Sequence, residues 1–337
     1  MRALVVHPGP NFSVADVYRG WVKGLRACGV EVAELNLDER LSFYGQAHLK
    51  KNGRWYKAFD DEAVFHMASK GLEVACYEWW PDVVVVISAF FVPPSLYGIM
   101  RARGHKVVIV HTESPYEDDM QLRRAPHADV SIINDPTNLD RFREVTTAAY
   151  IPHAYDPELH HPRKPVKGCG SDVFFVGTGY PSRIGFLEQI DWSGIDLALA
   201  GNWQLTDKQS PLRQHVIHPI ENCFENHEAV GWYASTKASF NLYRKEASEH
   251  HDGWAIGPRE VELAACGTFF AREPRGEGDE LFPMLPTFST PEELGEVLRY
   301  YLNHDRERET AAMKAREAVA DRTFANNAAE LLRLLDA

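Results

Sequence analysis

The residues of this chain that could best bind an anion lie between positions 241 and 267. They are Arg244, Lys245, Gly257, Pro258, Arg259 and Glu262. Proline is favoured in the first turn of a helix, where its missing N–H leaves no bond unmade, so we expect a helix to begin at Gly257-Pro258. On that helix Arg259 and Glu262 are three positions apart and share one face. We therefore expect cations, helix N–H groups and a carboxylate to converge.

This set of groups suits a nucleotide sugar. A diphosphate is bound by cations and by the N–H groups of a helix N-terminus, and a carboxylate bridges a ribose diol through two hydrogen bonds. We therefore assign Arg244, Lys245 and Arg259 to the diphosphate, and Glu262 to the ribose. The alternative is that Arg259 and Glu262 form an ordinary ion pair on a surface helix, which contributes little to stability.

Residues 257–267 resemble the C-terminal signature of the CgeB-like (spore-maturation-type) branch of the group 1 glycosyltransferases. In that branch a Gly/Ser-Pro-Arg-x-x-Glu-x-x-Ala-x-Gly run opens the donor-binding helix. The resemblance implies the GT-B fold, in which two Rossmann-like lobes face a cleft, and it favours a retaining sugar transfer. The larger group usually carries a Glu, seven residues, Glu pair; counting back from Glu262, the first member falls at Trp254.

Strand-like and helix-like segments alternate along the chain, which predicts parallel strands joined by helices. The strands are expected at 3–7, 32–35, 83–88, 106–111, 130–134, 149–151, 172–176, 197–201, 216–218, 238–242 and 268–271. Residues 83–87 are apolar at every position, a pattern typical of an interior strand covered by helices on both faces. The fold class is therefore expected to be α/β, with two doubly wound lobes.

A Pro-, Lys- and Gly-rich connector at 162–170 separates the two halves of the chain. We expect an N-terminal Rossmann-like acceptor lobe over 1–155 and a C-terminal Rossmann-like donor lobe over 156–320. The family resemblance adds a helix over 321–337 that packs back on the first lobe. Ligands of doubly wound sheets bind at the carboxyl ends of the strands, so the functional residues should follow the strands.

Two turns of the second lobe are candidates for donor contacts. Gly177, Thr178 and Arg183 belong to a strand-turn-helix segment whose backbone could cradle a phosphate; the alternative is a simple tight turn. Asn202 and Trp203 follow the next strand, where an amide and an aromatic plane could frame a nucleobase. The alternative there is a tryptophan that caps the edge of the core. The first turn lacks the third glycine of a dinucleotide site, which argues against a nicotinamide cofactor.

Three sites of the first lobe also follow expected strands. Gly9 and Asn11 are assigned to the acceptor, unless their loop serves only to turn the chain. His111 and Glu113 follow a buried strand, and an inverting transfer needs such a group to take the proton of the acceptor hydroxyl. A retaining transfer asks less of them, because the departing diphosphate could accept that proton. His153 matches a linker run of the family and is assigned to the acceptor; a structural histidine is the alternative for both His111 and His153.

Metal ions and cofactors find little support in the sequence. The doublets His160-His161 and His250-His251 do not supply convergent ligands, and there is no H-x-x-x-H, C-x-x-C or convincing D-x-D motif. Phosphate-loop and nucleophile-elbow motifs are absent from the sequence as well. We expect a metal-independent enzyme without a cofactor, the nucleotide sugar being its co-substrate.

Composition restricts the partners and the compartment. With 337 residues, a formal net charge of −12 and no Lys/Arg-rich block, the chain as a whole is not expected to bind nucleic acid. A local basic cleft within the acidic whole stays open as an alternative. Its five cysteines are scattered without a C-x-x-C pair, as is typical of reduced thiols, and residues 1–7 enter an apolar strand without the features of a secretion signal. No run approaches the ~18 apolar residues of a membrane span. We expect a cytoplasmic protein without a membrane span.

We hypothesise that the chain is a hexosyl- or pentosyltransferase that moves a sugar from a nucleoside-diphosphate sugar to an acceptor hydroxyl. The acceptor, whether a glycan, a small molecule, a protein or a modified nucleobase, is not specified by the sequence. Three alternatives remain open. They are a nucleotide-sugar epimerase, a non-catalytic nucleotide-sugar-binding protein, and a phage-type glycosyltransferase acting on modified DNA bases.

Overall fold

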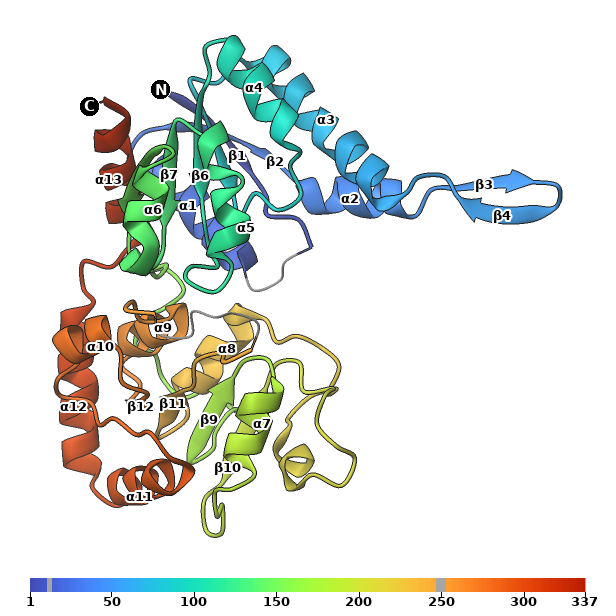
Figure 1. Ribbon diagram of the computed structural model, residues 1–337. Coiled ribbons are helices and arrows are strands. Elements are labelled where there is room, and N and C mark those ends of the chain that lie inside the picture. The colour runs from blue at the N-terminus through green and yellow to red at the C-terminus, as the bar shows by residue number, and fades with distance from the viewer. Residues whose placement is uncertain (11–13, 247–252, 337) are drawn as a thin grey trace. The chain divides into compact units, whose positions relative to one another are not determined.

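The computed structural model describes residues 1–10, 14–246 and 253–336. The chain separates into two compact units (Figure 1): unit 1 comprises Met1–Pro152 and Phe324–Ala337, and unit 2 comprises His153–Thr323. The sequence predicts these boundaries at 155 and 320. Each unit has its own parallel strands and its own hydrophobic core.

Unit 1 is built on a six-stranded sheet with the strand order β2-β1-β5-β6-β7-β8, and all of its neighbouring strands are parallel. The strands are β1 (Arg2–Val6), β2 (Glu31–Leu35), β5 (Val83–Ile87), β6 (Lys106–Val110), β7 (Val130–Ile133) and β8 (Thr147–Tyr150). The helices are α1 (Ala15–Ala27), α2 (Leu37–Gly45), α3 (Asp61–Trp79), α4 (Pro94–Ala102), α5 (Asp118–Leu122), α6 (Leu139–Arg143) and α13 (Phe324–Asp336). The strand order reverses between β1 and β5, and doubly wound sheets bind ligands at such a switch point.

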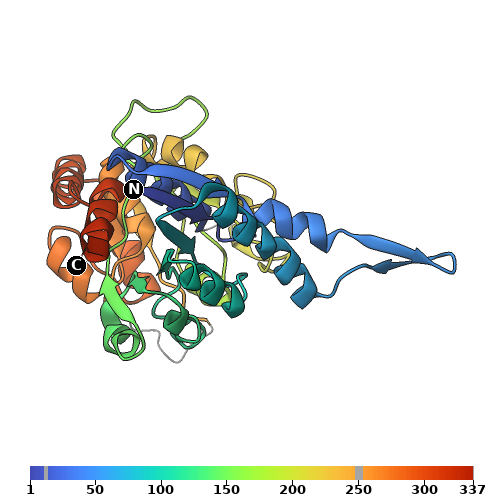
Figure 2. The same ribbon diagram turned by 90° about the horizontal axis from the view of Figure 1, so that it is seen from above.

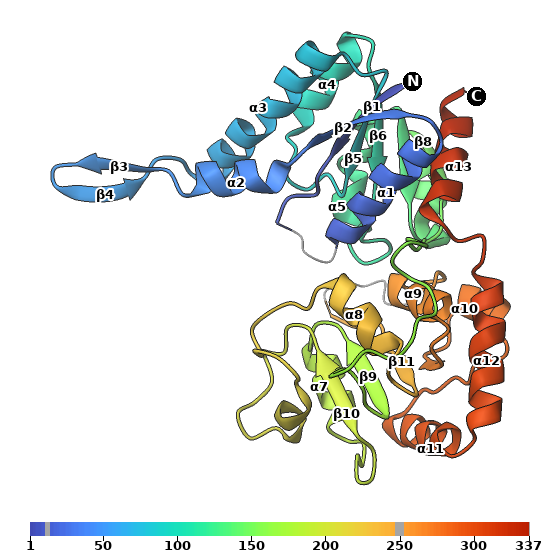
Figure 3. The same cartoon turned by 180° about the vertical axis from the view of Figure 1, so that it is seen from behind.

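Alternate residues of β5 enter two separate cores, one on each face of the sheet. Val83, Val85 and Ile87 pack with α1 and α13, whereas Val84 and Val86 pack with α2, α3 and α4. All five residues are buried, as expected for an interior strand covered on both faces. Helix α13 lies beside α1 in this layer (Figure 3), so the last helix of the chain belongs to the unit that contains its first strand.

A β-hairpin that the sequence analysis does not anticipate extends from unit 1. Its strands are β3 (His48–Lys51) and β4 (Arg54–Lys57), and they pair in antiparallel register. Figures 1 and 2 show the hairpin reaching beyond α2 and α3, and every residue of both strands is exposed. The hairpin therefore forms no part of a core of unit 1.

Unit 2 has a second set of parallel strands. They are β9 (Val173–Val176), β10 (Leu197–Ala200), β11 (Ser239–Asn241) and β12 (Phe270–Arg272). The strands pair as β10-β9 and β11-β12, and a bridge between Val173 and Ala238 joins the two pairs. The helices are α7 (Pro181–Leu187), α8 (Asn226–Tyr233), α9 (Pro258–Cys266), α10 (Gly276–Leu281), α11 (Pro291–Leu302) and α12 (Asp305–Ala318). Because β9 and β11 are neighbours, the turns that follow them lie side by side.

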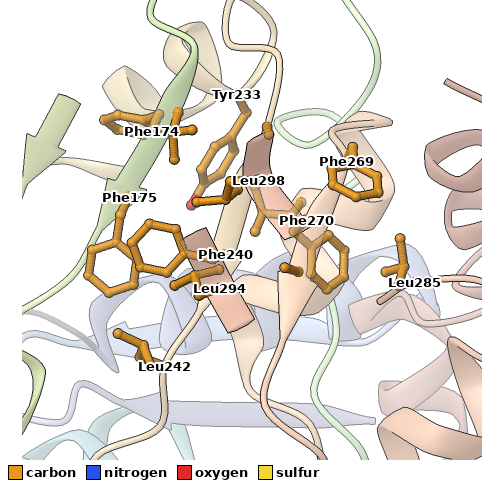
Figure 4. Packing of buried hydrophobic residues seen from close by; sticks show 14 of the residues in the cluster. Phe174, Phe175, Tyr233, Phe240, Leu242, Phe269, Phe270, Leu285, Leu294 and Leu298 are labelled. Carbon is orange, nitrogen blue, oxygen red and sulfur yellow. The ribbon is translucent and has the colours of Figure 1, made fainter. Parts of the chain in front are cut away.

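Aromatic side chains pack together with aliphatic ones in the core of unit 2 (Figure 4). Phe175 of β9 and Phe240 of β11 stack with their ring centroids 4.8 Å apart, and both are fully buried. Burial of one such side chain contributes roughly 1.5–3 kcal/mol. This packing fixes the carboxyl ends of β9 and β11, from which the candidate site is built.

The strand predicted at 216–218 is wrong. In that segment Val216 makes a single bridge to Leu199, and the residues before it form a short 3-10 helix over Pro211–His215. A run of only three residues, two of them β-branched, offers too little local signal to separate a strand from one bridged residue. Within the described residues, no helix is long and apolar enough to cross a membrane.

Candidate anion-binding site

The turn after β9 brings two arginines against the backbone of Gly177. A Cβ built on Gly177 would lie 2.4 Å from Nη2 of Arg259 and 3.4 Å from Nη1 of Arg183. The absence of a side chain at this position is therefore what allows both guanidinium groups to approach the chain. Two of the four cations assigned from the sequence thus meet at one turn.

Arg259 is held by two neutral acceptors. Its Nε donates to the carbonyl oxygen of Val176 at 2.7 Å, and its Nη1 donates to Oδ1 of Asn241 at 2.6 Å. The guanidinium also lies over the Phe175 ring, 4.5 Å from its centroid. Among the described residues Arg259 forms no ion pair, so the surface pair with Glu262 is not formed. Burial lowers the pKa of Arg259, but a guanidinium remains charged at neutral pH.

Asn241, the last residue of β11, was not singled out from the sequence. Its Oδ1 orients Arg259, whereas its buried Nδ2 finds no hydrogen-bond acceptor in the described part of the chain. An unsatisfied buried donor is costly, on the order of 1–3 kcal/mol. The carboxyl end of β11 therefore presents an amide N–H group that an oxygen-rich ligand would satisfy.

Arg183 and Arg244 extend this positive region along the turn. Arg183 is buried and donates from Nε and Nη2 to the carbonyl oxygen of Leu242, and from Nη1 to that of Thr178. Both cations lie near the Tyr180 ring, whose centroid is 5.2 Å from Cζ of Arg183 and 6.0 Å from Cζ of Arg244. Thr178 thus positions Arg183 through its backbone, and three arginines gather around one turn. We call Arg183, Arg244 and Arg259 the arginine cluster.

Lys245 points to a carboxylate. Its Nζ lies 2.9 Å from Oε1 of Glu273, and the other oxygen of Glu273 accepts a hydrogen bond from the Tyr243 N–H at 2.6 Å. The ion pair is half-exposed at the lysine, so it is partly screened by solvent. A phosphate that binds Lys245 has to compete with Glu273.

The backbone nest expected at the start of α7 holds a side chain of the protein itself. Oε1 of Glu246 accepts from the Ser182 N–H at 2.7 Å, and Oε2 accepts from the Lys245 N–H at 3.2 Å. Burial acts to raise the pKa of Glu246, but the hydrogen bonds from Ser182 and Lys245 outweigh it and lower the pKa. The turn therefore binds a carboxylate in this structure, and a phosphate has to displace it.

Helix α9 begins at Gly257-Pro258, as the sequence predicts, and ends at Gly267. Glu262 lies on this helix and is largely buried. Its Oε1 accepts from Nδ2 of Asn226 at 3.1 Å and lies 3.8 Å from Nε2 of His160. The carboxylate is thus oriented by α8 and by the segment around His160, a pairing that sequence spacing could not reveal because these partners are distant in the chain.

Glu260 is a further buried carboxyl group that the sequence analysis missed. Its Oε2 accepts from the Tyr243 hydroxyl at 2.5 Å and from the Gly257 N–H at 2.8 Å. Burial raises the pKa of Glu260 to about 7, although both hydrogen bonds oppose the shift. A glutamate in the first turn of a helix, three residues after its start, is a known capping signal that could have identified it. Glu260 fixes the start of α9 against the turn after β11.

The assignment of Trp203 to a nucleobase is wrong. Trp203 is fully buried in the core of unit 2, and its indole N–H donates to the carbonyl oxygen of Ala200 at 2.9 Å. The side-chain amide of Asn202 is hydrogen-bonded to the backbone of the protein. Its Nδ2 donates to Glu221 O at 3.1 Å, and its Oδ1 accepts from the Gln204 N–H at 3.1 Å. From the sequence, an aromatic residue after a strand could pack at the edge of the core or contact a ligand. The complete burial of Trp203 shows that it packs in the core.

The structure also argues against His111 as a proton acceptor. Its side chain is fully buried, with Nε2 3.2 Å from Oγ of Ser131 and the ring packed against Phe142. Burial, and secondly the charge of Arg124, lower the pKa of His111 to about 3. A general base works best with a pKa near the operating pH, so this imidazole is too weak a base. The sequence shows that His111 ends a strand, but not that Ser131 of β7 and Phe142 of α6 pack against its ring.

The remaining candidates are placed as follows. Glu113 is partly buried, and its backbone N–H donates to Oε1 of Gln121 at 3.2 Å. Gly9 is buried after β1 and donates its N–H to Nδ1 of His7 at 3.2 Å, while Asn11 lies outside the described residues. His153 is the first residue of unit 2 and is partly buried. Glu113 and Gly9 both follow strands of the unit 1 sheet at the same edge, on either side of β5.

Histidine doublets show no metal-like arrangement in the part of the chain that is described. Nε2 of His160 is 3.3 Å from Oδ1 of Asn226, and Nδ1 of His161 is 3.1 Å from the carbonyl oxygen of Pro162. His250-His251 lies outside the described residues. No group of three or more His, Cys, Asp or Glu side chains suited to a metal ion occurs among the described residues.

A family model and several solved structures are similar to this chain. Residues 183–333 match a family model described as Glycosyl transferase-like. No curated protein matches the chain significantly. The match to the family model spans α7 to α13 and includes the arginine cluster, Lys245 and Glu262.

Solved structures resemble the whole chain in fold. Sucrose-phosphate synthase from Thermosynechococcus elongatus has a TM-score of 0.66 and 12% identity, over 100% of this chain and 98% of that one. An alpha-glucosyltransferase in complex with UDP has a TM-score of 0.68 and 12% identity, over 100% and 99%. An E. coli structure described as trehalose-6-phosphate bound with UDP-2-fluoro glucose has a TM-score of 0.63 and 9% identity, over 99% of both chains. At these identities the likeness shows the fold, which is GT-B.

The two comparisons agree with the expectations from the sequence at a coarse level. The α/β fold class of two Rossmann-like lobes is confirmed by the GT-B structures. The expected enzyme class, a glycosyltransferase, is confirmed by the family model together with that fold.

Proposed function

We propose that the protein transfers a sugar from a nucleoside-diphosphate sugar to an acceptor hydroxyl, with the diphosphate bound by the arginine cluster. The observation that carries this proposal is the placement of Arg259. Its guanidinium lies at the backbone of Gly177 and is hydrogen-bonded only to neutral acceptors among the described residues. A partly buried guanidinium that forms no ion pair is costly, and an anionic ligand would compensate it.

The neighbouring groups add further hydrogen-bond donors for an anion at this turn. The N–H of Ser182 already binds the carboxylate of Glu246, so the turn has demonstrated donors for an anion. The unsatisfied Nδ2 of Asn241 adds another donor. Glu262, held by Asn226, is proposed to accept hydrogen bonds from the ribose hydroxyls.

We propose a retaining, metal-independent transfer. The bond between the sugar C1 and the diphosphate oxygen breaks, and the acceptor oxygen joins C1 on the same face. The acceptor proton passes to an oxygen of the departing diphosphate. Because His111 is too weak a base for this task, a mechanism that needs no protein base is favoured. The arginine cluster would stabilise the charge that develops on the leaving group.

Finer assignments rest on the sequence motif and on the neighbours. The run from Gly257 to Gly267 supports membership of the CgeB-like branch. The titles of two structural neighbours name UDP or a UDP sugar, so a uridine diphosphate sugar is our first candidate for the donor. Reduced cysteines favour a cytoplasmic location.

Ligand-induced thermal stabilisation with UDP, GDP, ADP and dTDP tests the proposal without an acceptor. A nucleotide present at about 100 times its Kd stabilises the folded state by about 2.7 kcal/mol, which raises the Tm by several degrees. We expect at least one nucleotide to do so, and Arg259→Lys to abolish most of the shift. Arg306→Lys, at an exposed position of α12, serves as the matched control.

Product analysis then separates transfer from the alternatives. Incubation with the corresponding nucleotide sugar should release the nucleoside diphosphate by slow hydrolysis even without an acceptor. Conversion of the sugar without release would indicate an epimerase, and binding without any turnover would indicate a non-catalytic binding protein. Absence of a thermal shift with all four nucleotides would refute the proposed site.

A further inference from the structure

The hairpin β3–β4 of unit 1 takes no part in the sites described above, and its composition differs from that of the rest of the chain. Residues 46–59 contain Lys50, Lys51, Arg54 and Lys57 and no acidic residue, whereas the whole chain has a formal net charge of −12. The hairpin, which projects from unit 1 (Figure 3), therefore carries a local excess of positive charge in an acidic chain.

Both faces of the hairpin combine cations with apolar or aromatic side chains. Residues directly opposite each other in an antiparallel pair share a face. The register pairs Lys50 with Trp55 and His48 with Lys57 on one face, and Leu49 with Tyr56 and Lys51 with Arg54 on the other. The hairpin is therefore not an amphipathic element with one face ready to pack on a core.

Its apolar side chains are exposed to an unusual extent. Trp55 is 66% exposed, Leu49 62% and Tyr56 51%. The Nζ of Lys50 lies 5.7 Å from the centroid of the Trp55 ring, so the ring is shared with a cation rather than with a core. Exposed apolar side chains of this extent mark a binding surface. In the major groove of a DNA duplex, such side chains can contact the methyl group of thymine.

The tip of the hairpin is a tight turn flanked by charged residues. Asn52 and Gly53 both have positive φ, 50° and 77°, which is the two-residue turn that Asn-Gly favours because its twist matches that of the strands. Lys51 and Arg54 flank this turn. Insertion of a charged tip into lipid hydrocarbon is costly, so the arrangement disfavours a membrane anchor.

We propose that the hairpin β3–β4 is an arm that binds duplex DNA, with the two-stranded ribbon lying in the major groove. The major groove of B-DNA is wide enough for such a ribbon, and both of its walls carry phosphates that match cations on both faces. The major groove of duplex RNA is deep and narrow and does not admit it. The acidic side chains of Asp60, Asp61 and Glu62 lie at the base of the hairpin, which confines the contact to the projecting part. This inference does not depend on the proposed sugar transfer.

Fluorescence anisotropy with a labelled 20-base-pair DNA duplex, measured between 25 and 200 mM NaCl, tests the arm. Four phosphate contacts predict that log K falls with log[salt] with a slope of about −3.6. The variant Lys50→Ala/Lys51→Ala/Arg54→Ala/Lys57→Ala should lose at least about tenfold in affinity at low salt and most of that slope. Trp55→Ala should weaken binding with the slope unchanged.

The matched control removes the same charge elsewhere. Lys164, Lys167, Lys208 and Lys314 are exposed and lie outside the hairpin, so their joint replacement by alanine changes the net charge equally. DNA binding by this control should equal that of the wild type. Circular dichroism and the thermal shift with UDP should be the same for all variants, because the hairpin contributes to no core.

Four outcomes would overturn the proposal. They are no binding of DNA by the wild type, equal losses in the hairpin and control variants, equal affinity for duplex RNA, and binding to phosphatidylserine vesicles but not to DNA. A change of oligomeric state in the hairpin variant, without a change in DNA binding, would instead assign the arm to a second copy of the chain.

Discussion

A single methyl group on Gly177 should disable the proposed diphosphate site. The alanine Cβ would lie 2.4 Å from Nη2 of Arg259, far inside van der Waals contact, so the guanidinium has to move. Arg259 is held at 2.7 Å by Val176 O and at 2.6 Å by Asn241 Oδ1, and the movement breaks at least one of these bonds. Gly177 also has a φ of 157°, so the alanine strains the backbone of the turn. The perturbation therefore acts on the positions of the cation and of this turn, and not on the charge of Arg259.

The expected size of the effect follows from the bond that a phosphate would lose. A hydrogen bond to a charged group contributes about 1.5–3 kcal/mol. At 1.4 kcal/mol for each factor of ten, the Kd for the nucleotide should rise by about 10- to 150-fold. Isothermal titration calorimetry with UDP, at a temperature well below the Tm of the variant, measures this change directly.

The control is Gly185→Ala in α7, the helix that follows the same turn. A Cβ at Gly185 meets no atom within 4 Å, so this variant should bind UDP as the wild type does. If Gly177→Ala also binds UDP with unchanged affinity, Arg259 does not contact the diphosphate and the reasoning fails.

Further predictions concern turnover, pH dependence and the core. Arg259→Lys should reduce turnover by a factor on the order of 10² or more in a donor-hydrolysis assay, with unchanged turnover contradicting a role in leaving-group stabilisation. The pKa of Glu260 is raised from 4.5 to about 7, so the folded state favours the protonated form. The contribution of the protonated Glu260 to the free energy of unfolding is complete below pH 4.5 and is lost as the pH rises through 7. Urea unfolding should therefore give a free energy of unfolding that is lower at pH 8 than at pH 5 by up to ~3 kcal/mol, and Glu260→Gln should remove this difference. The same difference in the wild type and in Glu260→Gln would refute the prediction. Trp203→Ala should lower the free energy of unfolding by about 3–5 kcal/mol, as for a core aromatic residue. A loss under 1 kcal/mol would contradict the burial of Trp203 in the core.

The main elements of the fold were predictable because their signals are local. The apolar run at 83–87 and the Gly257-Pro258 start of α9 depend on composition and on neighbouring residues, and both are found in the structure. The hairpin was missed although Asn52-Gly53 is a strong turn signal, because its strands lack the alternation of a half-buried strand.

The sequence was enough to identify several residues of the candidate site, but not the residues that they contact. Arg259 could be identified from its spacing, whereas its contact with Gly177 depends on the pairing of β9 with β11, which are far apart in the sequence. Trp203 and His111 were misassigned for a related reason. The end of a strand can be located from the sequence, but whether the side chain there is buried depends on tertiary packing.

A crystal structure of the wild-type protein with bound UDP tests the central claim most directly. We predict that a diphosphate oxygen lies within hydrogen-bonding distance of Nη2 of Arg259, beside the backbone of Gly177. UDP bound with both phosphates away from Arg183, Arg244 and Arg259 would contradict the account.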